Sequence, residues 1–446
     1  MGHVLLAAPT VAHFALTDAL LRLLVRRGTR TTVLTTDLVT ARMFEAHGIA
    51  TRFLAPSGHR PTADPTLDEF ARRDVRLASE REDRRLLHRA HAWLARRSAP
   101  LVRHFETELP DVVVTFDARN GLARLIHATA RIFGCATAHL GEGVLPGTLQ
   151  RDLCGIDGDR EAPIRSETPA DRALLDSALA AALALGAGRA YLPQRVVFPP
   201  SLGDRIATWF AAPRDGGRTA RGVRIAAWCE AVRCREPDAR SAPRQLPEAP
   251  FVAVLLQAQD DPRVRLDADA PPSCAELVAA TRRAAASLGL AERVAVVRPA
   301  RGATAMLDGL ACLPHDAAPV VAATAAAVVT INDGRAFVGA LAGTPTLCLG
   351  RAFWARDGLA TTTTLARLSD DLRAAMERRT DDAQRRTMTA ILREEHVWCD
   401  GARPDVNGLG GIAAWLEALL ARAAPPPPPV RYESGPSWPA DSDEGE

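Results

Sequence analysis

The sequence has no lysine, so its 55 lysine-plus-arginine residues are all arginines. Catalysis through a lysine Schiff base or a lysine general base is therefore excluded. Cysteine is sparse as well: the eight cysteines lack CxxC spacing, and the closest pair is Cys229 and Cys234. In a chain of this size we expect buried thiols, not disulfides or zinc ligands.

Long apolar runs are also missing. Stretches such as residues 178–187 fall well short of the roughly 20 residues that span a bilayer. The start of the chain moves directly into an apolar run without a basic leader, so we expect a cytoplasmic protein. A formal net charge of +2 gives no general argument for nucleic acid, and no nucleic-acid partner is expected.

Cofactor and metal motifs are absent from the turns where they are usually found. Residues 9–14, which follow the first apolar run, lack the GxGxxG pattern of a dinucleotide site. Asp267 and Asp269 have the spacing of a metal-binding DxD pair, but they follow the polar turn at 257–261, and we expect them to be solvated. The sequence therefore predicts neither a bound cofactor nor a required metal.

Apolar runs alternate with helical patterns in two blocks, which predicts two doubly wound α/β domains of the GT-B type facing a cleft. A stretch rich in Arg, Pro and Gly separates the blocks, and five consecutive prolines precede an acidic end that is predicted to be disordered. The predicted boundaries are a first domain at 1–200, a crossover at 201–250, a second domain at 251–423 and a tail at 424–446.

The segment 328–359 carries the clearest functional pattern. An apolar run at 328–331 is followed by Asn332, Asp333 and Gly334, and a helical pattern begins at Arg335. In a parallel sheet, a turn of this kind lies at the carboxyl edge, where the amides of the next helix can hold an anion. An ordinary αβ repeat without a ligand is the alternative.

Other polar residues also follow apolar runs. Glu142 lies between two glycines after the run at 135–140, and Gln257 and Asp261 follow the run at 251–256. Arg298 follows the run at 294–297. Because the carboxyl ends of parallel strands meet at one edge, these residues are candidates for a site, although each turn alone is a weak signal.

Residues 66–105 form a helical, Arg-rich region in which acidic residues stop at Asp83. A solvated helix is one interpretation. The other is a surface for an anionic acceptor or an anionic membrane.

Four stretches read together resemble the capsular polysaccharide biosynthesis and export family, which includes bacterial β-Kdo transferases. They are Glu142-Gly143 with Thr148-Leu149-Gln150 and Gly155-Ile156-Asp157-Gly158; Leu256-Gln257 with Asp261; Arg298-Pro299; and Thr330-Ile331-Asn332 with Gly343-Thr344-Pro345, Leu349-Gly350-Arg351-Ala352 and Gly358-Leu359. The last stretch is the most specific. The resemblance covers roughly residues 110–400.

The resemblance implies a GT-B enzyme that transfers a Kdo-like sugar from a CMP-sugar to a lipid or glycolipid acceptor with retention. It implies that Asp261 acts at the anomeric carbon and that Glu142 faces it as acid/base. Gln257 would bind the donor, and Asn332, Asp333, Gly334 and Arg335 would hold its single phosphate. Capsule assembly proteins and the inner membrane would be partners.

The chain departs from the family at three places. Arg298 replaces a histidine, Asp333-Gly334 replaces a Ser-Thr pair at the phosphate turn, and Pro146-Gly147 replaces an Arg-Pro pair. Two further interpretations therefore stay open. One is a catalytically degenerate homologue that acts as a binding partner in capsule production, and the other is another GT-B enzyme such as a UDP-sugar transferase or an epimerase.

Overall fold

A computed structural model describes the two folded parts of the chain. The described residues are 2–7, 9, 13–57, 64–78, 84–116, 120–145, 148–153, 169–185, 246–259, 261–268, 271–299, 310–355, 358–378, 380–397, 399–400, 403–404 and 406–422. Most of the predicted crossover and the whole predicted tail at 424–446 lie outside these residues.

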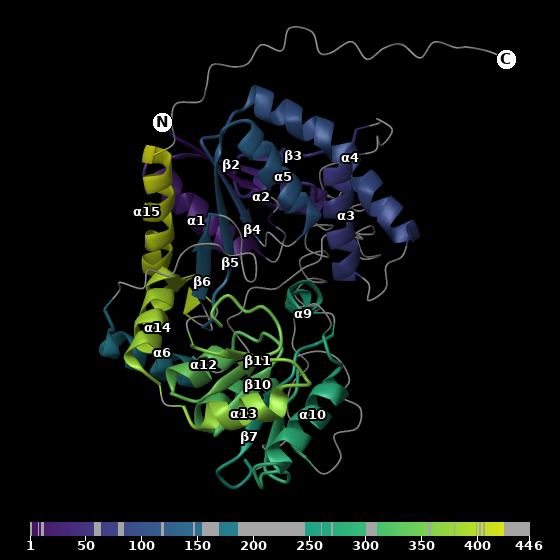
Figure 1. The fold of residues 1–446 in the computed structure, drawn as a ribbon. Coiled ribbons are helices and arrows are strands. Elements are labelled where there is room, and N and C mark those ends of the chain that lie inside the picture. Colours follow the sequence, from purple (N-terminus) through teal and green to yellow (C-terminus); the bar gives the residue numbers. More distant parts are fainter. Residues whose placement is uncertain are drawn as a thin grey trace, which may run out of the picture.

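The first domain is built on a seven-stranded sheet with the order β13-β6-β5-β4-β1-β2-β3 (Figure 1). Strands β1 to β5 are parallel, β6 pairs antiparallel with β5, and β13 pairs antiparallel with β6 at the edge of the sheet. Its elements are β1 (His3–Ala7), α1 (Phe14–Arg26), β2 (Arg30–Thr35), α2 (Leu38–Ala46), β3 (Thr51–Phe53), α3 (Pro65–Ala78), α4 (Arg84–Thr107), β4 (Val112–Phe116), α5 (Gly121–Ile132), β5 (Ala136–Glu142) and β6 (Thr148–Asp152).

The second domain has a six-stranded, wholly parallel sheet with the order β12-β11-β10-β7-β8-β9. Its elements are α6 (Arg172–Leu185), β7 (Val252–Leu255), α9 (Pro262–Asp267), α10 (Cys274–Ala286), β8 (Val294–Val297), β9 (Ala311–Leu313), a 3-10 turn (His315–Ala317), α11 (Ala318–Thr324), β10 (Ala327–Thr330), α12 (Ala336–Leu341), β11 (Thr346–Cys348), β12 (Thr361–Thr362), α13 (Leu368–Met376) and α14 (Asp382–Glu394). The strand order reverses between β7 and β10, which is the point where ligands bind in such sheets.

The chain then returns to the first domain. It forms β13 (Glu395–Val397), the short β14 (Cys399–Asp400) and β15 (Arg403–Pro404), and finally α15 (Val406–Arg422). Apolar side chains of α15, including Leu409, Ile412 and Leu416, share a core with Leu16 and Leu20 of α1. Figure 1 shows α15 standing beside α1.

Two helices therefore lie outside the domain that the predicted boundaries give them. Helix α15 covers the first sheet, although the sequence places it with the second domain. Conversely, α6 packs its Leu175 and Ala182 into the core of the second domain. Both helices are rich in apolar residues, and that composition does not specify which sheet covers them.

The prediction of two doubly wound domains of the GT-B type is confirmed by these two sheets and their strand orders. Within the described ranges, every helix is either too short or too polar to cross a membrane. The four cysteines at 135, 274, 312 and 348 form no disulfides.

The core of the first domain contains the buried His139 with the half-buried His127 beside it. His139 of β5 shares a hydrogen bond with Thr115 of β4, with 2.6 Å between Nδ1 and Oγ1, and its ring meets the ring of His127 on α5 at 4.5 Å. Burial, together with smaller contributions from nearby His127 and Arg124, lowers the pKa of His139 to about 3. Protonation would place a charge in this core.

We expect this pair to make the first domain sensitive to acid. A histidine whose pKa is lowered on folding stabilises the fold fully above its unfolded pKa of about 6.5 and loses that contribution as pH falls toward the folded value. Between pH 6 and pH 4, His139 should reduce the free energy of unfolding by about 1.4 kcal/mol per pH unit. Urea unfolding of His139→Gln should show a shallower pH slope than the wild type. His88→Gln, at an exposed position on α4, should leave the slope unchanged.

Candidate functional site

The loops after β7 and β10 are joined by an amide pair at the switch point of the second sheet. Gln257 Nε2 donates to Asn332 Oδ1 at 2.9 Å, and the backbone N–H of Asn332 donates to Gln257 Oε1 at 2.9 Å. Asn332 Nδ2 also donates to the carbonyl oxygen of Arg263 in α9 at 2.9 Å. Both side chains are buried, and their hydrogen bonds fix the relative positions of the two loops and α9.

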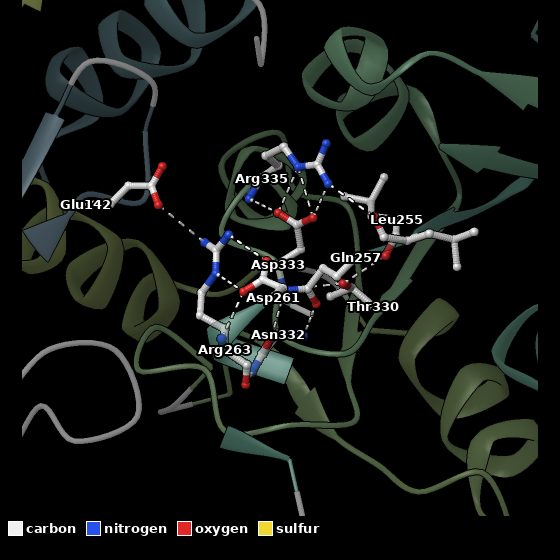
Figure 2. A network of polar contacts seen from close by, with 10 residues as sticks. Glu142, Leu255, Gln257, Asp261, Arg263, Thr330, Asn332, Asp333 and Arg335 are labelled. Carbon is white, nitrogen blue, oxygen red and sulfur yellow. Dashed lines mark hydrogen bonds and ion pairs between the residues drawn. The ribbon is translucent and has the colours of Figure 1, made fainter. Parts of the chain in front are cut away.

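Asp333 and Arg335 form a buried ion pair within the turn itself (Figure 2). Arg335 Nε donates to both carboxylate oxygens of Asp333 at 2.9 Å, and Arg335 Nη2 forms a further short contact with Oδ2. Further guanidinium contacts go to the carbonyl oxygens of His315 and Leu256. Arg335 thus compensates the negative charge that Asp333 places in the turn.

The electrostatics of this pair follow from its burial. Burial would raise the pKa of Asp333, but the charge and hydrogen bonds of Arg335 lower it to about 2. Asp333 is therefore ionised at neutral pH. Because the Arg335 guanidinium is directed at Asp333 and at two carbonyl groups, the buried pair acts as a structural unit in this arrangement.

Asp261 lies at the start of α9 and makes two kinds of contact with Arg263. Its Oδ1 accepts the backbone N–H of Arg263 at 2.9 Å as an N-cap, and its Oδ2 accepts Nη2 of the same residue at 3.1 Å. Pro262 occupies the first helical position, where its missing N–H costs nothing. The Asp-Pro-Arg sequence therefore both starts the helix and sets the ion pair.

Glu142, at the end of β5 in the first domain, approaches the same arginine from the opposite side. Its Oε2 lies 3.8 Å from Arg263 Nη1, and Figure 2 shows the guanidinium between Glu142 and Asp261. Two further contacts join the domains: Arg265 Nη1 donates to the carbonyl oxygen of Leu77 at 2.7 Å, and Gly334 lies against the backbone of Val144. The two carboxylates therefore face each other across the domain boundary, with Arg263 between them.

A small pocket remains between the domains at this point. It is lined by Glu142, Arg263, Gly334 and Arg351, together with Trp354 and its neighbours. Its volume of about 10 Å³ is close to the space of a single water molecule. This pocket is therefore far too small to hold a nucleotide sugar in the present arrangement of the domains.

Arg263 and Arg351 are the arginines that line this pocket. Arg351 has a largely exposed side chain that lies 3.8 Å from buried Asp267 and donates to the carbonyl oxygen of Leu266. The backbone N–H of Arg351 donates to the carbonyl oxygen of Asp267 at 2.7 Å. At the preceding Gly350, a Cβ atom would come within 3.1 to 3.2 Å of three atoms. An anion in this pocket can therefore contact Arg263 and Arg351 more readily than Arg335, because the guanidinium of Arg335 is bonded to Asp333.

His315 was not singled out from the sequence, yet it belongs to this region. It follows β9, and its carbonyl oxygen accepts Nη1 of Arg335 at 3.2 Å. Burial lowers the pKa of its imidazole to about 3, with a further contribution from the charge of Arg335, so it is neutral at pH 7. The feature of the sequence that could have indicated His315 is its position directly after a short apolar run and Pro314.

Arg298 lies at the end of β8, one strand away from Gln257 on the same edge of the sheet. Its backbone N–H donates to the carbonyl oxygen of Leu313 at 3.0 Å. It is half-buried and is not among the residues that line the pocket between the domains.

The structure thus brings Glu142, Asp261, Gln257 and the residues 332–335 together, with Arg298 at the same sheet edge. Arg263 and His315 are the additions that sequence analysis missed. In the described part of the chain, no group of three or more His, Cys, Asp or Glu residues is arranged to hold a metal ion. The roles assigned to these residues remain predictions.

Comparisons with known proteins give only distant matches. No family model matches the sequence, and no curated protein matches it. Among solved structures, the kitacinnamycin glycotransferase is 15% identical over 94% of this chain and 99% of its own, with a TM-score of 0.36. MnaA of S. aureus, solved with UDP, is 11% identical over 96% and 99%, with a TM-score of 0.36.

A third similar structure is KpsC of Thermosulfurimonas dismutans, a β-Kdo 2,4 transferase. It is 16% identical over 68% of this chain and 88% of its own, with a TM-score of 0.38. Identities and TM-scores at this level assign neither a donor nor a reaction to this chain.

Proposed function

We propose that the chain is a retaining glycosyltransferase that takes a Kdo-like sugar from a CMP-sugar. The observation that carries the proposal is the meeting of Glu142 and Asp261 around Arg263, from the carboxyl edges of two facing sheets. Retaining sugar chemistry commonly uses two carboxyl groups on opposite sides of the anomeric centre. The identity of the sugar and its CMP carrier rests on the sequence resemblance.

In the proposed reaction, Asp261 acts at the anomeric carbon and Glu142 acts as acid/base toward the acceptor. Both carboxylates are held close to Arg263 when the domains are together. Opening the domains would separate Glu142 from Arg263, because the two residues belong to different domains. The donor would then enter between Glu142 and Arg263, with its sugar next to Asp261.

The leaving phosphate needs cations, and this chain offers several arginines around the proposed entry point. Arg263 and Arg351 line the pocket, while Arg335 is held by Asp333. The phosphate role predicted for residues 332–335 would therefore be served mainly by the turn backbone at Gly334. A single phosphate can be stabilised by arginines and backbone amides without a metal ion.

The proposed acceptor is a lipid or glycolipid, with the anionic inner membrane and capsule assembly proteins as partners. Arginines are exposed along α3 and α4 of the first domain: Arg72, Arg76, Arg84, Arg85, Arg89, Arg96 and Arg103. An exposed cationic surface of this kind attracts anionic lipids.

Calorimetric titration with CMP, UDP and dTDP tests the proposal. CMP should bind with a measurable enthalpy, and UDP and dTDP should bind more weakly. Binding of UDP in preference to CMP would instead indicate a UDP-sugar transferase or an epimerase. Absence of binding by all three nucleotides would contradict a transferase.

A second candidate function is a non-catalytic partner in capsule production. It is favoured by the phosphate turn, where Asp333 and Gly334 replace two hydroxyl donors and Arg335 is paired with Asp333. Complementation separates the two functions: Asp261→Ala should still support capsule production if the chain acts only as a partner, and should fail if it is an enzyme.

Arg298 gives a sharper prediction for the transferase. If its guanidinium stabilises the departing phosphate, Arg298→Ala should reduce turnover by about a hundredfold, the usual effect of losing one such donor. Arg298→His should retain part of the activity, because imidazole can still donate a hydrogen bond. Initial rates with a CMP-sugar would measure both. Equal rates for Arg298→Ala and the wild type would remove Arg298 from the site.

A further inference from the structure

Helix α9 lies at the boundary between the two domains, and both of its arginines reach the first domain. The contact of Arg263 with Glu142 belongs to the site described above. Arg265 does not line the pocket at that site, and its Nη1 donates to the carbonyl oxygen of Leu77 in α3 at 2.7 Å. Figure 1 shows α9 next to α3, which it contacts. Helix α9 therefore has a second connection to the first domain, outside the pocket.

The guanidinium of Arg265 is also held by its own domain. Its Nε donates to the carbonyl oxygen of Gln259, in the loop between β7 and α9, at 3.0 Å. Because the guanidinium is planar and rigid, this bond directs Nη1 toward α3 before the domains meet. The carbonyl oxygen of Leu77 belongs to the last turn of α3, where carbonyl groups have no partner within the helix and a cation is favourable.

The backbone of Arg265 connects this contact to Asp261. The N–H of Arg265 donates to the carbonyl oxygen of Asp261 at 3.1 Å, one helical turn earlier. Asp261 is also the N-cap of α9, so its carbonyl group and its side chain are both bonded to the same helix. A helix of six residues is not stable on its own in water. The position of Asp261 therefore depends on the contacts that hold α9 in place.

The second domain holds the other side of α9. Asn332 Nδ2 donates to the carbonyl oxygen of Arg263 at 2.9 Å. The backbone N–H of Arg351 donates to the carbonyl oxygen of Asp267 at 2.7 Å. If the first domain moves away, these two bonds stay within the second domain, whereas the bond from Arg265 to Leu77 is lost.

We propose that Arg265 is a positioning residue for Asp261. It holds α9 against α3 when the two domains are together, and the carboxylate of Asp261 reaches its reactive position in that arrangement alone. The role of Asp261 in sugar transfer rests on the proposed function. The attachment of α9 to α3 does not, because it follows from the bonds that Arg265 forms with Gln259 and Leu77.

Hydrogen–deuterium exchange of the full-length protein tests this attachment without a substrate. Arg265→Met keeps an unbranched apolar side chain and removes the guanidinium. The amides of α9 should exchange about tenfold faster in this variant, or more, which is the change in an opening equilibrium expected for a lost hydrogen bond from a charged group. Peptides from α10 should exchange as in the wild type, which shows that the second domain is folded. Equal exchange of α9 in Arg265→Met and the wild type would overturn the proposal.

Two further variants assign the effect to the contact between the domains. Arg293→Met is the matched control, because Arg293 Nη1 donates to the carbonyl oxygen of Ala249 within the second domain. It should leave α9 exchange and kcat unchanged. Arg265→Lys keeps a positive charge with N–H donors and should give α9 an exchange rate between those of Arg265→Met and the wild type. Equally fast α9 exchange in Arg293→Met and Arg265→Met would overturn the assignment.

Steady-state rates with a CMP-sugar test the effect on Asp261. In Arg265→Met, kcat should fall about tenfold or more, whereas the Kd for CMP should change little, because the turn at 332–335 keeps its contacts. A structural loss throughout the second domain would weaken CMP binding as well and would contradict the positioning role. Unchanged kcat in a variant with faster α9 exchange would also overturn that role. Wild-type protein that transfers no sugar, together with faster α9 exchange in Arg265→Met, would contradict the proposed function and support the attachment of α9 to α3.

Discussion

Arg335→Ala should lower the free energy of unfolding of the second domain by about 3 to 5 kcal/mol at pH 7. This is the usual cost of leaving one member of a buried ion pair uncompensated. Asp333 is almost completely buried, and its carboxylate depends on Arg335 for its main ionic contacts. Chemical unfolding followed by circular dichroism would measure the loss.

The pH dependence of this loss identifies its cause. In the wild type, the pKa of Asp333 is lowered to about 2, so the stabilisation is present above about pH 4 and disappears only as pH falls toward 2. Without Arg335, burial should raise the pKa of Asp333, and the carboxylate can escape its penalty by binding a proton. The difference between variant and wild type should therefore shrink as pH is lowered from 7 to 5.

Two controls accompany Arg335→Ala. Arg386→Ala removes one partner of an exposed ion pair with Asp382 on α14 and should cost no more than about 1 kcal/mol. The double variant Asp333→Asn with Arg335→Met removes both charges and should recover much of the lost stability. A cost for Arg335→Ala equal to that of Arg386→Ala would show that the buried pair does not support the fold.

Glu142→Gln should reduce transfer from a CMP-sugar by a factor of about one hundred to ten thousand, the range for loss of a general acid/base. The amide preserves the shape of the side chain but cannot exchange a proton near neutral pH. Asp261→Ala should remove turnover entirely, because it deletes the carboxylate at the proposed reacting carbon. Steady-state kinetics should show the loss in kcat.

Binding measurements distinguish a chemical effect from a structural one. The Kd for CMP should change little in Glu142→Gln, because Glu142 lies in the domain opposite the phosphate turn. Asp18→Asn, which alters an exposed ion pair on α1, should leave kcat unchanged. Retention of more than a tenth of the wild-type kcat by Glu142→Gln would exclude Glu142 as the acid/base.

The order of strands and helices could be predicted because apolar runs and turn residues are local features. The predicted run at 294–297 coincides with β8, and the run at 328–331 differs from β10 by one residue at each end. The same reasoning placed Glu142, Asp261 and Arg298 at the ends of strands or in the loops that follow them. The fold class was therefore accessible from the pattern alone.

The contacts within the site were less accessible. Asp333 and Arg335 are two residues apart, and their charges alone do not show whether Arg335 turns toward Asp333 or toward a ligand. The position of Arg263 depends on an N-cap at Asp261 and on the approach of Glu142, which is 121 residues earlier in the sequence. The burial of α15 against α1 likewise depends on a contact between the two ends of the chain.

The exchange of α6 and α15 between the domains has a kinematic consequence. Among the described elements, the chain passes from one domain to the other twice: between β6 and α6, and at the junction of α14 with β13, where helix and strand are adjacent in sequence. At the second passage no loop intervenes, because α14 ends at Glu394 and β13 begins at Glu395. A domain movement that keeps both elements intact must therefore pivot close to this junction, and the parts of the two domains that lie farthest from it move the most.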